Sequence, residues 1–201
     1  ERYRDAALQG IADILDVHAR DSAAVIQAVR MGTTVGTNAL LERQGAATVL
    51  AINDGFGDAL AIGYQSRPDI FALRIQRPAP LYGHVLEIRG RLDAAGREAE
   101  PLDLALAEAG LRAAFAQGYR SLAIVLLPAW RTPAHHLALE DLARRLGYDQ
   151  VSVSHRCSPA IRLVGRGDTT VVDAYLSPIL RRYVAQVANG LAGLRQATIR
   201  G

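Results

Sequence analysis

A strand–helix–strand alternation between residues 121 and 155 limits the fold of this chain more than any other feature. In the segment Ser121–Leu127, residues 122–127 are continuously apolar, which is typical of a buried strand. A helical pattern follows from Pro133, a residue that suits a first helical turn, to Gly147, and Gln150–Ser154 is again strand-like. Such a unit has parallel strands, so the sequence predicts an α/β fold class with a mixed sheet and flanking helices.

Further elements are expected on both sides of this unit. The region Tyr64–Tyr82 holds three prolines and is expected to be a long structured loop. Ser177 and Pro178 suggest the start of a new helix, with serine as the N-cap and proline at the first helical position. The other expected elements are helices over Tyr3–Val17, Phe56–Ile62 and Leu102–Gln117, a strand or helix over Val25–Arg30, strands over Ala47–Ile52 and His84–Leu92, and a turn over Asp93–Gly96 that leads into Arg97–Ala99.

Two helical stripes indicate which faces are buried. The helix over residues 102–117 is expected to bury Leu104, Leu106, Leu111, Ala114 and Phe115. The final segment carries the stripe Leu180, Tyr183, Val184, Val187, Leu191 and Leu194. Residues 1–201 are expected to form one α/β fragment, in which residues 169–201 are a helical segment leading into the following domain.

The composition excludes several classes of function. All 23 basic residues are arginine, so a lysine Schiff base or phosphate-loop lysine within this chain is excluded. The arginines are scattered among 20 acidic residues, which argues against a nucleic-acid surface. The single cysteine, Cys157, excludes an internal disulfide and fits a reducing cytoplasm. The longest apolar run, Leu122–Leu127, is far shorter than the roughly 20 residues of a membrane-spanning helix.

The stretch Met31–Arg43 suits an anion. Glycines and threonines lead into a short helix that is expected to end at Gly45, where glycine accepts a positive φ. Small residues let a ligand approach the backbone, and the start of a helix supplies free N–H groups with partial positive charge. The alternative is that the threonines are ordinary helix N-caps.

This stretch and a second block resemble the hydantoinase/5-oxoprolinase family, in its 5-oxoprolinase branch rather than its methylhydantoinase branch. The resemblance runs from about Tyr3 to Val187. The first block is Gly32-Thr33-Thr34 with Thr37-Asn38-Ala39-Leu40-Leu41-Glu42-Arg43, and the second is Arg166-Gly167-Asp168-Thr169-Thr170-Val171-Val172-Asp173-Ala174-Tyr175-Leu176-Ser177-Pro178. Supporting matches between them are Gly55-Phe56, Asp58, Ile62-Gly63, Gln65, Arg67-Pro68, Phe71, Arg77-Pro78 and Leu81-Tyr82.

The resemblance implies a wider architecture and a set of partners. The family is similar to the actin and sugar-kinase superfamily, a ribonuclease-H-like architecture in which ATP sits between two α/β lobes. It implies ATP and Mg²⁺ as cofactors, a small cyclic amide as substrate, and a cytoplasmic place in glutathione metabolism. It also implies the remainder of the polypeptide or a companion subunit as partner, and a homo-oligomer. The scattered charges and short apolar runs described above predict that neither nucleic acid nor a membrane is bound. The chain is expected to be an excised piece that starts after the phosphate-holding hairpin of such proteins.

Opening a lactam with ATP requires carboxylates for Mg²⁺ and donors for phosphate. The resemblance makes Asp168 and Asp173 the candidate catalytic or metal-binding carboxylates. The alternative is that Asp168 or Thr169 caps a helix and Asp173 is a solvated acid in its first turn.

Six residues are candidates for binding substrate or phosphate. Arg67, like Arg77, lies in the proline-rich loop and could grip a substrate carboxylate through its planar fork, although such arginines are often only solvated. The candidates are Gly32, Thr33, Thr34, Thr37, Asn38 and Arg67.

The remaining reactive side chains favour structural roles. Cys157 stands in an aliphatic position of the family pattern and is expected to be a small, inert buried residue, whereas His155 could be a site residue at the end of a strand. His135 and His136 are adjacent on a helix, so their rings point about 100° apart and do not chelate one metal. Trp130 is expected to pack at a strand–helix junction.

The sequence therefore predicts part of an ATP-dependent 5-oxoprolinase that converts 5-oxo-L-proline to L-glutamate. One alternative is an ATP-dependent N-methylhydantoinase or a related carboxylase subunit. Another is a scaffold or interaction domain that is inert when isolated. The fragment alone is expected not to turn over ATP.

Overall fold

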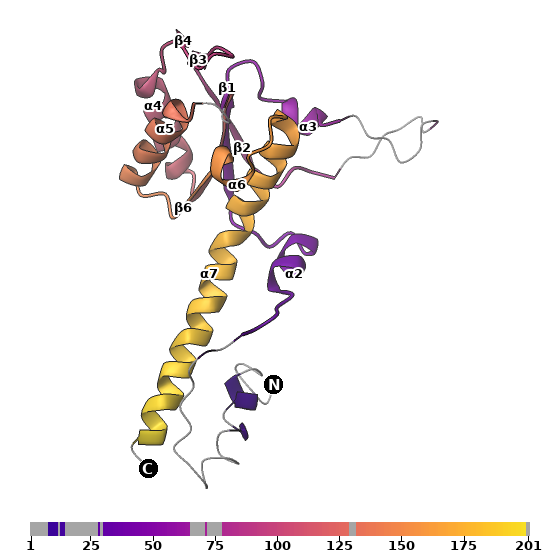
Figure 1. Ribbon diagram of the computed structural model, residues 1–201, viewed down its shortest axis with the longest axis vertical. Coiled ribbons are helices and arrows are strands. Elements are labelled where there is room, and N and C mark those ends of the chain that lie inside the picture. The colour runs from indigo at the N-terminus through magenta and orange to yellow at the C-terminus, as the bar shows by residue number, and fades with distance from the viewer. Residues whose placement is uncertain are drawn as a thin grey trace. The chain divides into compact units, whose positions relative to one another are not determined.

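The computed structural model describes residues 8–11, 13–14, 28, 30–64, 71, 78–128 and 132–199. The chain divides into two compact units, of which one comprises residues 39–178 and the other residues 1–38 with residues 179–201. Figure 1 shows the parallel sheet and its helices within residues 39–178. Arg67 and Trp130, and most of the expected elements Tyr3–Val17, Val25–Arg30 and Tyr64–Tyr82, lie outside the described residues.

A four-stranded parallel sheet forms the centre of residues 39–178. Its order is β2 (His84–Ile88), β1 (Thr48–Asn53), β5 (Ser121–Val125) and β6 (Gln150–Val153). Every residue of β1, β5 and β6 is buried. The expected strands over Ala47–Ile52, Ser121–Leu127 and Gln150–Ser154 are confirmed, and the apolar runs of the first two are typical of strands covered on both faces.

Helices cover both faces of the sheet. Val49 and Ala51 of β1 face α4 (Leu104–Ala116) and α5 (Ala134–Arg145), whereas Leu50 and Ile52 face α3 (Ala59–Ile62) and the first turns of the long helix α7 (Leu163–Ile199). A short helix, α6 (Ser154–Cys157), follows β6 directly. The α/β fold class is confirmed.

The buried face of α4 differs from the expected one. Its buried residues are Ala107, Leu111 and Ala114, whereas Leu104 and Leu106 are 42% and 46% exposed. The spacing i, i+4, i+7 defines the stripe that meets the sheet, and Leu104 and Leu106 lie beside the cap in the first turn.

The antiparallel pairing lies in a separate hairpin. The expected strand His84–Leu92 is split, because Gly90 has a φ of 131° between β2 and β3 (Arg91–Leu92). Strand β3 pairs with β4 (Glu98–Glu100). The parallel and antiparallel pairs therefore occupy two sheets.

Helix α7 is continuous from Leu163 to Ile199, so the expectation of a new helix at Ser177 is wrong. Pro178 lies inside α7 and has no N–H to donate to the carbonyl of Ala174, four residues before it. The Ser121 hydroxyl donates to that carbonyl instead, at 2.6 Å. The proline is tolerated because the sheet supplies the missing donor.

The helix after the threonine segment is shorter than expected. Helix α2 runs over Val35–Leu41, and the residue with left-handed backbone is Arg43, at a φ of 58°, rather than Gly45. Gly45 serves a different purpose, because a Cβ there would overlap the ring of Tyr175. No helix of the described residues is long and apolar enough to cross a membrane.

Replacing Gly45 with alanine should lower the free energy of unfolding by about 1–3 kcal/mol, the usual range for overpacking. Gly32→Ala is the matched control, because a Cβ at Gly32 meets no atom within 4 Å. Urea unfolding of both variants measures the difference. Equal stability of the two variants would contradict the close contact between Gly45 and Tyr175.

Candidate functional site

The carboxyl ends of β1 and β5 lie at the topological switch point, the place where open parallel sheets commonly bind ligands. The chain leaves β1 for β2 on one side and reaches β5 on the other, so the strand order reverses between β1 and β5. Three segments meet there: Asn53, the turn at residues 54–58, and residues 126–128 after β5.

Asn53 holds this edge together. Its Nδ2 donates to the Gly90 carbonyl at 3.0 Å, and its Oδ1 accepts from the N–H of Leu127 at 2.7 Å. The side chain is buried, so both bonds replace water. Asn53 therefore joins the ends of β1, β2 and β5.

The glycine turn after β1 binds a carboxylate of the protein itself, that of Glu87. The N–H groups of Gly55 and Gly57 both donate to Glu87 Oε1, each at 3.0 Å. These two donors are thus occupied by an internal carboxylate.

His136 fixes the end of β5 as a neutral acceptor. Its Nε2 accepts from the N–H of Leu126 at 3.1 Å and lies 3.1 Å from Ser154 Oγ. Burial, with additional repulsion from His155 and Arg166, lowers the pKa of His136 to about 3. Its neighbour His135 instead lies 3.0 Å from Glu98 Oε1, so the two adjacent rings serve different contacts.

Arg166 holds the same residue from the other side. Its Nη2 donates to the Leu126 carbonyl at 2.8 Å, and the whole residue is buried. The N–H and the carbonyl of Leu126 are therefore both hydrogen-bonded to buried side chains, the N–H to His136 and the carbonyl to Arg166. Sequence reasoning missed this pair: Arg166 opens the second family block, but nothing in the sequence indicated that its side chain is buried.

Asp168 and Asp173 both lie inside α7, which begins at Leu163. The alternative that Asp168 or Thr169 caps a helix is therefore wrong. The alternative that Asp173 lies in the first helical turn is wrong for the same reason. Asp168 is exposed, and partial burial of its carboxyl raises its pKa. Its charge, together with that of Asp58, adds to the effect of burial in raising the pKa of Tyr82.

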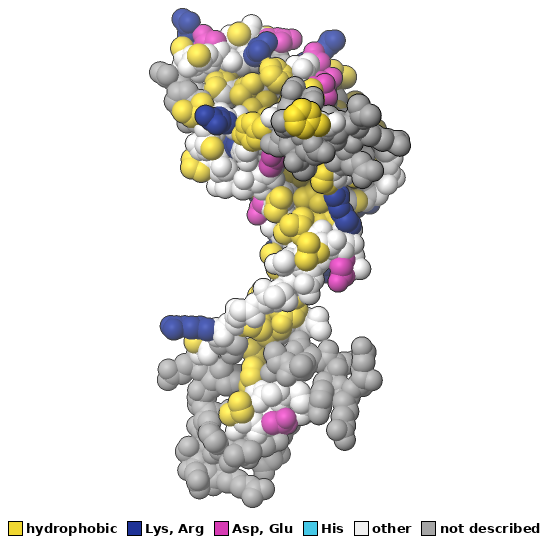
Figure 2. Space-filling view, turned by 90° about the vertical axis from the view of Figure 1, so that its right-hand side faces the viewer, with side chains coloured by type: hydrophobic (Ala, Val, Ile, Leu, Met, Phe, Trp, Pro, Cys, Tyr) yellow, Lys and Arg dark blue, Asp and Glu magenta, His cyan; other side chains and the backbone are white. Residues whose placement is uncertain are grey.

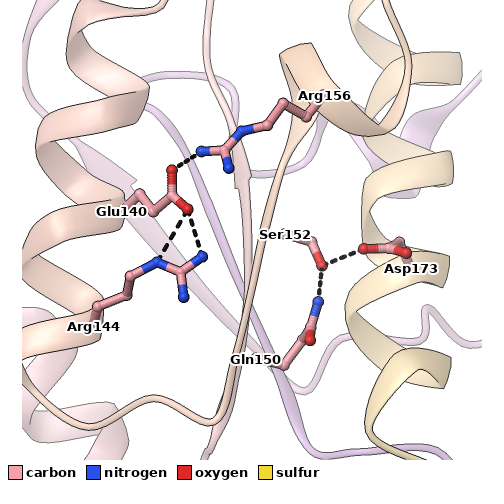
Figure 3. A network of polar contacts seen from close by, with 6 residues as sticks. All are labelled: Glu140, Arg144, Gln150, Ser152, Arg156 and Asp173. Carbon is pink, nitrogen blue, oxygen red and sulfur yellow. Dashed lines mark hydrogen bonds and ion pairs between the residues drawn. The ribbon is translucent and has the colours of Figure 1, made fainter. Parts of the chain in front are cut away.

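Asp173 accepts hydrogen bonds from two serine hydroxyls, of which Figure 3 shows that of Ser152. Ser152 Oγ donates to its Oδ2 at 2.6 Å and Ser177 Oγ donates to its Oδ1 at 3.1 Å. Gln150 in turn donates to Ser152 at 2.8 Å. The Ser152 contact at Oδ2 joins β6 to α7, whereas the Ser177 contact at Oδ1 lies within α7, one turn along the helix.

Cys157 lies in α6, half-buried, with its Sγ 3.6 Å from Asp173 Oδ2. Burial and the adjacent Asp173 carboxylate raise the pKa of the thiol to about 11. His155 lies in α6 rather than at a strand end, and its ring packs edge-on against His136. These surroundings oppose a nucleophilic role for the cysteine.

A separate ion network joins α5 to α6. Glu140 accepts from Arg144, one turn along α5, at 2.6 Å, and from Arg156 of α6 (Figure 3). The spacing of Glu140 and Arg144 is a sequence signal for the first contact, whereas nothing in the sequence indicated Arg156.

The threonine segment belongs to the other unit. Gly32, Thr33, Thr34, Thr37 and Asn38 are all exposed, and Thr33 Oγ1 accepts from the N–H of Val35 at 3.2 Å. Thr33 thus stabilises the start of α2, as the capping alternative supposed. The other side chains are accessible to a ligand.

Among the described residues, no group of three His, Cys, Asp or Glu side chains could hold a metal ion.

A groove of about 510 Å³ lies at the opposite, amino-terminal edge of the sheet, where Thr48, Gly83 and Tyr119 line it. On the face in Figure 2, arginine and acidic side chains are interspersed.

Comparisons with known proteins agree on one family. The model of the hydantoinase/oxoprolinase N-terminal region matches residues 2–147. The chain is 36% identical to 5-oxoprolinase 1 of Arabidopsis thaliana over 91% of its length, and 33% identical to 5-oxoprolinase of Dictyostelium discoideum over 94%. It covers only 17% and 18% of those two proteins.

A solved structure is also similar. The ATP-dependent caprolactamase of Pseudomonas jessenii matches 94% of this chain at a TM-score of 0.80 and 31% identity, and the match covers 28% of that protein chain. The similarity is consistent with the expected actin-like ATPase architecture.

Stability should fall as the pH drops below about 6.5, because His136 is neutral in the folded chain. Its folded pKa of about 3 lies below the ordinary value of 6.5, so the unfolded chain binds the proton first. The expected loss from this residue is about 2 kcal/mol between pH 7 and pH 5. Urea unfolding at several pH values measures it. A His136→Gln variant with the wild-type pH slope would contradict the assignment.

Cys157 should react slowly with a thiol reagent at pH 8, where a thiol with a pKa of about 11 is almost wholly protonated. Asp173→Asn should speed labelling several-fold, because it removes the negative charge beside the sulfur. Asp141→Asn, a change of an exposed acid on α5, is the matched control. Rapid labelling of the unchanged chain would contradict the inert role.

Proposed function

Because the chain belongs to the hydantoinase/oxoprolinase family, we propose that it forms part of an ATP-dependent 5-oxoprolinase. The observation that carries the proposal is the similarity to two proteins named 5-oxoprolinase over more than nine-tenths of the chain. The reaction is the hydrolysis of the cyclic amide of 5-oxo-L-proline to L-glutamate. Residues 1–201 are then one α/β fragment of the N-terminal region, and residues 169–201 lead into the next domain.

The chemistry explains why ATP is consumed. An amide carbonyl is a poor electrophile, and the lactam ring is stable in water. Transfer of a phosphoryl group from ATP to the carbonyl oxygen makes the carbon more reactive and provides a leaving group. The protein must bind two anionic substrates, exclude bulk water and hold one water molecule for the attack.

The exposed segment Gly32–Asn38 is proposed to bind an anionic group of ATP or of the lactam. The hydroxyl groups of Thr34 and Thr37 and the side chain of Asn38 are accessible, and glycine lets the ligand approach the backbone. Arg67 retains its proposed role in holding a substrate carboxylate.

Asp168 fits a role beside Mg²⁺ better than Asp173 does. Magnesium in ATP sites commonly takes one or two carboxylates and completes its shell with phosphate and water, so a cluster of three acids is not required. Asp168 is exposed, whereas both oxygens of Asp173 accept hydrogen bonds. We therefore assign Asp173 to positioning α7 against β6.

Several wider properties remain part of the proposal: a cytoplasmic location, a role in glutathione metabolism, and a homo-oligomer that needs the rest of its polypeptide or a companion subunit. The runner-up substrate is another lactam or hydantoin, which the similarity to caprolactamase supports. 5-Oxoproline carries a carboxylate and caprolactam does not, so the two can be distinguished by their need for a cationic subsite.

The full-length protein should release phosphate from ATP faster with 5-oxoproline than with caprolactam or hydantoin. A phosphate-release assay with each compound measures this. If only caprolactam or hydantoin stimulates phosphate release, 5-oxoproline is not the substrate and the alternative is. If none of the three compounds stimulates it, the enzyme proposal is contradicted.

In the same protein, the double change Thr33→Val and Thr34→Val should lower turnover at least about tenfold, because it removes two hydroxyls at the proposed anion site while keeping the side-chain shape. The free energy of unfolding should fall by no more than about 2 kcal/mol, the usual upper cost of losing a helix cap, because Thr33 accepts from the Val35 N–H and both threonines are exposed. Full turnover in a folded variant would assign the threonines to capping alone.

A further inference from the structure

Arg166 presents a buried cation whose hydrogen bonds are only partly used. A guanidinium has five N–H groups. Nη1 donates to the carbonyls of Ala160 and Ile161, at 2.9 and 3.2 Å, and Nη2 donates to that of Leu126. Nε is buried and has no partner.

The unused donors form one side of the guanidinium. Three of the five N–H groups are taken by carbonyls, which leaves the Nε–H and one N–H of Nη2. Nε and Nη2 together make the side-on fork that grips the two oxygens of a carboxylate or phosphoryl group. Arg166 is thus held by the protein through its other edge.

No acid among the described residues fills this fork. None of the ion pairs found in residues 30–64, 78–128 and 132–199 includes Arg166. Asp168 is two residues further along α7, about 200° around the helix, and points elsewhere. Buried charges are normally paired, so a lone buried guanidinium indicates a missing anion.

Two neighbouring features also favour an anion. The Arg166 side chain turns back toward the start of α7, because its Nη1 reaches residues 160 and 161 just before the helix begins at Leu163. The first turn of a 37-residue helix adds partial positive charge. His155, whose pKa the Arg166 charge helps to lower, has a buried Nδ1 without a partner.

We propose that Arg166, the start of α7 and His155 form a subsite for a carboxylate or phosphoryl anion at the carboxyl edge of the sheet. The segment of residues 158–162, mostly exposed, lies between α6 and α7 and is tied to Arg166 through the two carbonyls. Because this segment is mostly exposed, it is the side from which we infer that an anion approaches the fork. The subsite rests on the proposed function for its substrates, which are the carboxylate of 5-oxoproline or a phosphate of ATP.

The test is ligand-induced stabilisation of the full-length protein, which requires no turnover. The probes are 5-oxoproline, inorganic phosphate and 2-pyrrolidinone, which is the same ring without the carboxylate. The variants are Arg166→Gln and, as a matched control, Arg162→Gln, which removes an exposed arginine beside the same helix start.

We expect 5-oxoproline or phosphate to raise the Tm of the unchanged protein and of Arg162→Gln, whereas 2-pyrrolidinone does not. Arg166→Gln should raise the Kd for the anion about 10- to 100-fold, because the variant loses charge-assisted hydrogen bonds to it. A response to 5-oxoproline alone identifies the carboxylate as the ligand, and one to phosphate alone identifies the phosphoryl group.

No stabilisation of the unchanged protein by either anion, or an undiminished response in Arg166→Gln, would overturn the subsite. If Arg166→Gln does not fold, a structure of the unchanged protein with each anion decides, and no anion oxygen within hydrogen-bond distance of Nε would overturn it. Anion binding through Arg166 without hydrolysis of 5-oxoproline would leave the subsite standing and refute the proposed function.

Discussion

The backbone at the end of β5 is the point on which the candidate site depends. His136 accepts the N–H of Leu126, Arg166 donates to its carbonyl, and Asn53 accepts the next N–H, that of Leu127. All three side chains are buried, so each bond replaces water and leaving one unmade is costly. They come from α5, α7 and β1, respectively. Polar contacts therefore fix the backbone at the carboxyl ends of β1 and β5, while apolar residues on both faces stabilise the sheet.

Much of this architecture could be predicted from the sequence, because the strands are covered on both faces. Ala47–Ile52 and Ser121–Leu127 are apolar except for Thr48 and Ser121, and each contains a buried parallel strand. The course of α7 could not be predicted in the same way. Serine followed by proline is a local signal for a helix start, but the hydroxyl of Ser121, more than fifty residues away, satisfies the carbonyl that Pro178 leaves free. A tertiary hydrogen bond therefore allows the helix to continue through a sequence that locally favours a helix start.

The candidate site was less accessible to sequence reasoning. The acids of the second family block could be identified, but their different surroundings could not: Asp173 is enclosed by serines, and Asp168 is exposed. Arg166 opens the second family block and His136 lies in an expected helix, but neither pattern shows that these side chains are buried. Arg67 remains a prediction, because it lies outside the described residues. Burial of a polar group depends on which helix faces meet, and periodicity alone does not determine that.

The central claim is that this chain is part of an enzyme that couples ATP to the opening of a lactam bearing a carboxylate. Its most direct test is the stoichiometry of the full-length protein's reaction, with glutamate and phosphate measured in the same sample. The account predicts that the two products appear together in a fixed ratio, and that neither forms from 5-oxoproline when ATP is withheld. Glutamate release without ATP, or phosphate release that is indifferent to 5-oxoproline and to every other cyclic amide, would contradict it.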